Sequence, residues 1–103
     1  MSGSGFVAVL VIDLHFPEAG SLKAKRKDLS SVKAQLHGRL GAAVSEIDHQ
    51  DTWQRSTLTA ALVGPDLRRL GAAADEAERF VLSRCPEGAH FERYVVSVED
   101  LRG

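Results

Sequence analysis

The spacing of hydrophobic residues changes several times along the chain, and each change marks the boundary of an expected element. Residues 6–14 are rich in valine and leucine without a break, which is typical of a strand buried on at least one face. After Ser21, which suits an N-cap, the apolar residues recur at helical spacing up to Gly41, which suits a helix C-terminus. These apolar residues are Leu22, Leu29, Val32, Leu36 and Leu40. The pattern therefore predicts a strand followed by a helix over residues 22–40.

The second half of the chain repeats this change of period. Residues 42–48 and 56–63 resemble two strands, and the second alternates leucine or alanine with threonine or alanine. Pro65 suits the first turn of a helix that then keeps a three-four apolar spacing to about Ser83. Residues 90–98, rich in valine and aromatic residues, close the series as a strand that we expect at a sheet edge.

The predicted order is strand, helix, strand, strand, helix, strand. In about a hundred residues this order indicates an α+β, ferredoxin-like split βαβ fold (βαββαβ), a four-stranded antiparallel sheet with two helices on one face. We expect one domain over residues 1–103, with residues 1–5 as a flexible lead-in. Right-handed crossovers bring residues 21–27, the tip of the hairpin 46–55 and the loop 85–90 to one end.

The composition is that of a globular domain, with 44% hydrophobic and 26% charged residues. The single cysteine, Cys85, can form neither an internal disulfide nor a cysteine pair for a metal ion, which favours a cytoplasmic location. No segment approaches the roughly 20 apolar residues needed to cross a bilayer, so no membrane association is expected.

Positive charge is concentrated at the start of the first predicted helix. Residues 21–40 contain six Lys or Arg residues and one acidic residue, Asp28, a local balance of plus five in a chain of net charge −1. Four of the six lie in the first two turns, where the helix dipole makes each exposed cation unfavourable by about 0.3 to 1 kcal/mol. The cluster either binds a phosphate of RNA or of a ligand, or pairs with Asp48 and Asp51 of the hairpin.

Two sets of candidate residues follow for this end of the molecule. The candidate anion- or RNA-binding residues are Lys23, Lys25, Arg26, Lys27 and Arg55. Their candidate partners at the hairpin tip are Asp48, His49, Asp51 and Trp53. Trp53 is either a platform on which a base stacks or a hydrophobic lid that pins the hairpin to the sheet, and we favour the lid.

Catalytic and metal-binding interpretations find little support in the spacing. His15, His49 and His90 fall near the same predicted end, but there is no His-x-x-x-His or His-x-His pair. Cys85 lacks an evident base that would activate it as a nucleophile. We therefore expect neither catalytic residues nor a metal ion or cofactor.

The sheet face turned away from the helices is predicted to be apolar and uncovered. It carries Val7, Val9 and Val11 from the first strand, with Thr57, Thr59, Ala61 and Val63 from the third. The aromatic pairs of RNA-recognition modules with this topology are missing. Such a face suits a partner protein or a second copy of the chain, so we expect a homodimer.

Two segments resemble a known family. DLHFPEAGSLKAKR (residues 13–26) and VSEIDHQDTWQRS (residues 44–56) are similar to the YlxP-like family, also called domain of unknown function 503, and the resemblance covers nearly the whole chain. It implies a small bacterial cytoplasmic protein of ferredoxin-like fold, often encoded near translation-initiation and ribosome-maturation factors, without an established activity. The family's motif usually reads Ser-Leu-Lys-Glu-Lys-Arg. Ala24 stands at the glutamate position here, so a capping box is lost.

The resulting expectation is a non-enzymatic binding module, attached to RNA or a ribosomal particle through the basic helix start. The first alternative is a homodimeric protein-interaction module that acts through the open sheet face. The second is a site for a small anionic ligand, or an enzyme-like site, built at the same end from the histidines with Asp48 and Asp51. The net charge of −1 argues against strong nonspecific binding to nucleic acids, and no DNA specificity is inferred.

Overall fold

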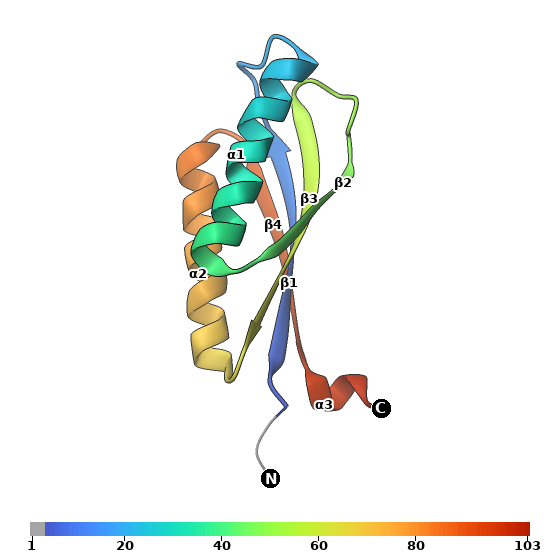
Figure 1. Ribbon diagram of the computed structural model, residues 1–103, viewed down its shortest axis with the longest axis vertical. Helices are drawn as coiled ribbons and strands as arrows, with labels where there is room; N and C mark the ends of the chain where they lie inside the picture. Colours follow the sequence, from blue (N-terminus) through green and yellow to red (C-terminus); the bar gives the residue numbers. More distant parts are fainter. Residues whose placement is uncertain (1–3) are drawn as a thin grey trace.

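The computed structural model describes residues 4–103, and its elements follow the predicted order (Figure 1). They are β1 (Phe6–His15), α1 (Leu22–Leu40), β2 (Ala43–Asp48), β3 (Arg55–Gly64), α2 (Leu67–Arg84), β4 (Ala89–Ser97) and a short α3 (Val98–Leu101). The four strands form one antiparallel sheet in the order β2-β3-β1-β4, and α1 and α2 cover the same face of it. The ferredoxin-like fold and the edge position of β4 are confirmed.

The ends of α1 follow from local chemistry that the sequence already indicated. The Ser21 hydroxyl accepts a hydrogen bond from the Ala24 amide at 3.1 Å, so the N-cap forms although the capping box is lost. Gly41 adopts a left-handed conformation with φ of 68°, and its amide donates to the carbonyl of His37. The predicted bounds of this helix are confirmed.

The start of the second long helix and the end of the last strand differ from the prediction. Asp66 is the N-cap of α2 and accepts from the Arg69 amide at 2.8 Å, so Pro65 precedes the helix instead of lying in its first turn. Val98 begins α3 instead of ending a strand, because Ser97 caps that short helix. The predicted lead-in over residues 1–5 lies partly outside the described residues, which begin at residue 4.

The core lies between the sheet and the two helices. Every second residue of β1 and β3 points into it, as the alternation of strand side chains requires. The strand contributions are Ala8, Leu10, Ile12, Leu14, Leu58, Ala60 and Leu62, and the helices add Leu29, Val32, Leu36, Leu70, Ala74, Ala77 and Val81. None of the described helices covers the opposite face of the sheet (Figure 1).

Three loops meet at the upper end of the molecule in Figure 1, as the topology predicted. The His15 amide donates to the Gly88 carbonyl at 2.7 Å, which joins the end of β1 to the α2–β4 loop. The Phe16 amide donates to the Gln54 carbonyl at 2.9 Å, which joins the same segment to the β2–β3 loop. The predicted common end is therefore confirmed.

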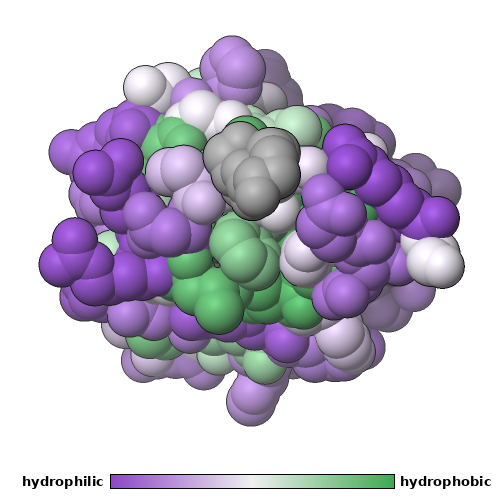
Figure 2. All heavy atoms as spheres, turned by 90° about the horizontal axis from the view of Figure 1, so that it is seen from below, coloured by the Kyte–Doolittle hydropathy of each residue, from purple (hydrophilic) through white to green (hydrophobic). Residues whose placement is uncertain are grey.

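The lower end is apolar by contrast. Figure 2 shows green hydrophobic side chains gathered there between purple hydrophilic ones. Val63, Leu67 and Leu101 are exposed, and an open groove of about 490 Å³ is lined in part by Val63 and Val98. The two ends of the molecule thus differ in chemical character.

The close approach of Gly88 to His15 yields a first prediction. A Cβ at position 88 would lie 2.4 Å from the Cβ of His15, so Gly88→Ala should lower the free energy of unfolding by about 1–3 kcal/mol. The matched control is Gly38→Ala in α1, where a Cβ meets nothing within 4 Å. This substitution should raise the free energy of unfolding by about 0.5–1 kcal/mol, because alanine favours the helix over glycine. Urea denaturation measures both. Equal stability of the Gly88 variant and the parent would contradict the close contact.

Candidate functional site

A buried lysine connects the start of α1 to the hairpin. Lys25 is 0% exposed, and its Nζ lies 2.5 Å from the carbonyl oxygen of His49 and 3.4 Å from that of Gln50. The same Nζ lies 3.2 Å from Oε2 of Glu46. One ammonium therefore bridges α1, β2 and the loop after β2.

The position of Lys25 on the helix explains its burial. The other buried residues of α1 are Leu29, Val32 and Leu36, which follow Lys25 at successive intervals of four, three and four residues. Lys25 thus occupies a core position on the helical stripe. It was predicted to bind external anions, and this is wrong because its ammonium is enclosed and already paired.

Glu46 is the charged partner of Lys25 and is itself largely enclosed. It lies on β2 opposite Leu58, on the helix side of the sheet, and its side chain is 11% exposed. The Ser56 hydroxyl donates to Oε2 at 2.6 Å. Burial raises the pKa of Glu46, but the hydrogen bonds from Ser56 and Lys25 and the charges of Lys25 and Arg26 outweigh burial and lower the pKa. The carboxylate therefore stays ionised.

The ion pairs predicted between the acidic residues of the hairpin tip and the cations of α1 do not form among the described residues. Oδ1 of Asp48 accepts from the His49 amide at 2.8 Å, and Oδ2 lies 3.7 Å from Nε2 of His49. His49 has a left-handed backbone with φ of 62°. Within residues 4–103, neither Asp48 nor Asp51 lies within 4.0 Å of a lysine or arginine nitrogen. The carboxylate that pairs with Lys25 belongs to Glu46 instead, because the side chain of Glu46 points from β2 towards the helices.

Three cations of the predicted cluster remain at the surface. Lys23, Arg26 and Lys27 are exposed, and none lies within 4.0 Å of a carboxylate oxygen of the described residues. Nη2 of Arg26 lies 3.5 Å from the Gln50 carbonyl. Arg55 does not join them, because it begins β3 on the sheet side opposite to its buried neighbour Ser56.

Two side chains fix the hairpin tip. Lys25 binds backbone carbonyls of the tip, and the amide side chain of Gln54 binds backbone carbonyls of the β1–α1 loop. Nε2 of Gln54 donates to the carbonyls of Pro17 and Ala19 at 3.3 and 3.5 Å, a role that the sequence pattern did not reveal. Trp53 is 54% exposed and does not belong to the hydrophobic residues that pack against the core. The predicted lid is therefore wrong, and the indole is accessible from solvent.

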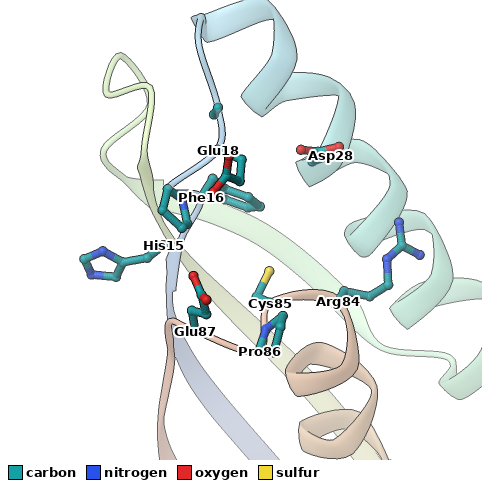
Figure 3. Close-up of a pocket in the computed structure, with 10 residues that line it drawn as sticks. His15, Phe16, Glu18, Asp28, Arg84, Cys85, Pro86 and Glu87 are labelled. Atoms are coloured by element: carbon teal, nitrogen blue, oxygen red, sulfur yellow. The ribbon is translucent and has the colours of Figure 1, made fainter.

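A cavity of about 310 Å³ lies beside this end, between the β1–α1 loop and the end of α2 (Figure 3). The Cys85 thiol points into it, whereas the ring of His15 points away. Burial raises the pKa of the Cys85 thiol, the charge of Arg84 opposes this, and Asp28 adds to it. The thiol is 6% exposed and stays protonated at neutral pH, as expected for an inert cysteine.

The histidines of the alternative enzyme-like site do not assemble. In the described part of the chain, His49 is the only histidine within 4.0 Å of a carboxylate. Over residues 4–103, no group of three or more His, Cys, Asp and Glu side chains could hold a metal ion. None of the described helices is long and apolar enough to span a membrane.

Comparison with known proteins identifies relatives without a known role. The model of the family "Protein of unknown function (DUF503)" matches residues 7–97. The "Uncharacterized protein YlxP" of Bacillus subtilis (strain 168) is 41% identical over 46 residues, which cover 45% of this chain and 50% of that protein. The aligned region thus spans half the length of this curated relative.

Two of the solved structures found by the comparison are designed proteins. The de novo designed protein Foldit4 has a TM-score of 0.58 at 8% identity, with 91% of this chain and 98% of that chain covered. A second de novo design, with a ferredoxin fold, has a TM-score of 0.38 at 15% identity and covers 89% of this chain and 85% of its own. The likeness to Foldit4 concerns the fold alone.

The Lys25–Glu46 pair predicts a large effect of one neutral substitution. Glu46→Gln leaves a buried ammonium without its carboxylate, so the free energy of unfolding should fall by about 3 kcal/mol. Asp48→Asn, which removes an exposed neighbouring charge, should change it by less than about 1 kcal/mol. The double variant Lys25→Met, Glu46→Gln should recover part of the loss, because no buried charge remains. Equal stability of the two single variants would refute the role of the pair.

The lowered pKa of Glu46 also predicts a dependence of stability on pH. Because the folded-state pKa lies below the ordinary value of 4.5, the pair stabilises the fold above that pH. This contribution should disappear as the pH falls through the folded-state pKa. Urea unfolding at a series of pH values should show the difference between the parent and Glu46→Gln shrinking below pH 4.5. A difference that stays constant down to strong acid would contradict the assignment.

Proposed function

We propose that this chain, which belongs to the DUF503 family of proteins of unknown function, is a non-enzymatic module that binds single-stranded RNA. One observation carries the proposal: three exposed cations that have no carboxylate partner among residues 4–103 share an end of the molecule with an exposed tryptophan. The cations are Lys23, Arg26 and Lys27, and the aromatic residue is Trp53. Phosphates and bases are the two groups that such side chains recognise together.

Electrostatics supports an anionic partner at the start of α1. This helix has no acidic residue in its first turn, so its cations face the positive end of the dipole without compensation. Lys25 is neutralised by Glu46, and because this pair carries no net charge, the charge of the three surface cations remains in excess. A bound phosphate would relieve this repulsion.

The hairpin supports a stacking role for Trp53. Lys25 fixes one side of the hairpin tip by its hydrogen bond to the carbonyl of His49. Gln54 fixes the other side by donating to carbonyls of the β1–α1 loop. The indole is therefore presented from a fixed loop, which lowers the entropy lost when a base stacks on it. Stacking of a base on an aromatic ring contributes about 1–3 kcal/mol.

A binding role fits the side chains of this end better than catalysis does. The buried Cys85 thiol has a raised pKa, and the described histidines form no base beside it. We propose ribosomal RNA as the partner in the cell and the cytoplasm as the location of the protein. The single buried cysteine is compatible with that compartment.

Replacement of the three surface cations tests the proposal. Lys23→Gln, Arg26→Gln, Lys27→Gln should keep the free energy of unfolding unchanged or slightly higher, because repulsion with the dipole is relieved. Its affinity for a short fluorescein-labelled oligouridylate, measured by fluorescence anisotropy, should fall. The slope of log affinity against log salt should decrease by roughly 2, at about 0.7 for each lost phosphate contact.

Two further variants separate a specific site from general charge. Arg68→Gln, Arg69→Gln, Arg79→Gln removes three exposed cations from α2 and should leave the affinity nearly unchanged. Trp53→Ala should weaken binding by about 1–3 kcal/mol without changing the salt slope. Equal losses in the α1 and α2 triple variants, or association with ribosomal particles that ribonuclease does not reduce and the α1 triple variant retains, would overturn the RNA proposal.

A further inference from the structure

We propose that two copies of the chain associate through their open sheet faces, with a twofold axis parallel to the strands. None of the helices in residues 4–103 covers this face (Figure 1). Several of its side chains are strongly exposed. Val63 is 80%, Tyr94 54% and Val96 36% exposed. The change in side-chain size across the sheet, which the strand register fixes, identifies the occupant as a second copy.

Side-chain size decreases across the sheet from one edge to the other. One row of the open face, fixed by the strand register, runs through Tyr94 on β4, Val9 on β1, Ala61 on β3 and Ala43 on β2. The β4 half of this row is bulky and the β2 half is small. A flat partner would leave gaps above the alanines.

A twofold axis along the strands converts this gradient into complementarity. The rotation places β4 of one copy over β2 of the other, and β1 over β3. Tyr94 then faces the partner's Ala43, and Val9 faces the partner's Ala61. The same contacts recur by symmetry, as an isologous interface requires. Two twisted sheets pack in this aligned manner with their inner side chains interdigitating.

The polarity of the face along the strands excludes the perpendicular axis. Towards the lower end the next row holds Val63, Val7 and Val96. Towards the upper end, the next row holds Glu92, Val11, Thr59 and Ser45, and the row after it holds Thr57, Asp13 and His90. The Thr57 hydroxyl donates to Oδ1 of Asp13 at 2.7 Å. An in-plane axis perpendicular to the strands would press the valines of one copy onto this polar row. The axis along the strands keeps apolar rows together.

The area of the face is sufficient for a stable dimer. The four strands are 10, 6, 10 and 9 residues long. At about 4.8 Å between strands and about 3.3 Å per residue, they cover roughly 550 Å² on each copy. The two copies would bury roughly 1,100 Å² in total, which exceeds the approximately 1,000 Å² expected of a specific interface. This total lies just below the standard range of about 1,200–2,000 Å².

Opposite charges at Ala43 and Tyr94 test both the dimer and its axis. These residues lie on opposite edges of one sheet, about 14 Å apart across three strand spacings, so they cannot pair within one copy. Ala43→Lys and Tyr94→Glu should each raise the dissociation constant at least about tenfold, because a charge is desolvated. The double variant, and an equimolar mixture of the two single variants, should recover much of the affinity. Sedimentation velocity over a concentration series measures all four samples.

Leu82→Glu is the control, because Leu82 is 43% exposed on α2 and lies outside the sheet. It should sediment as the parent does. A parent that remains monomeric at the highest soluble concentration would overturn the proposal. Weakening by both single variants without recovery in the double variant or in the mixture would overturn the proposed axis. Circular dichroism confirms that each variant is folded, so loss of the dimer is not confused with unfolding.

Discussion

The enclosed ammonium of Lys25 is the constraint on which the arrangement of the functional end depends. A buried charge is strongly unfavourable unless it is paired and hydrogen-bonded, so the fold must supply an anion and further acceptors at one point. Glu46 supplies the anion, and the loop that follows β2 supplies the carbonyls. The position of the hairpin relative to α1 is fixed as a result. The surface cations and Trp53 owe their common location to this requirement.

Segregation of charge and apolar surface gives the small sheet two distinct regions. The end near α1 presents cations and an indole, whereas the open face presents rows of valine with Tyr94. The chain's net charge of −1 conceals this division, because acidic residues elsewhere compensate the helix start. Arg93, for example, binds Asp75 and Glu78 and so ties β4 to α2 on the helix side. The two regions do not overlap, so neither proposal requires the other.

Periodicity and cap chemistry were enough to predict the fold, but not the inside of the site. Ser21 and Gly41 marked the ends of α1 because caps are decided by neighbouring residues. Lys25 was wrongly predicted to bind external anions, because the prediction relied on its charge and not on its helical spacing from Leu29, Val32 and Leu36. Its partner was missed for a related reason: Glu46 faces the helices only once the strand register is known. The exposure of Trp53 depends on how the loop packs, which no local pattern encodes.

Lys25 recognises the loop after β2 through backbone carbonyls, and this makes its contact with the loop independent of the side chains at positions 49 and 50. The carbonyls of His49 and Gln50 would remain in place with other residues at these positions, provided that the left-handed backbone at 49 is tolerated. Substitutions at positions 49 and 50 can therefore change the side chains that the hairpin tip presents to a partner without displacing the hairpin. Such an arrangement permits binding preference to diverge during evolution while the scaffold stays constant.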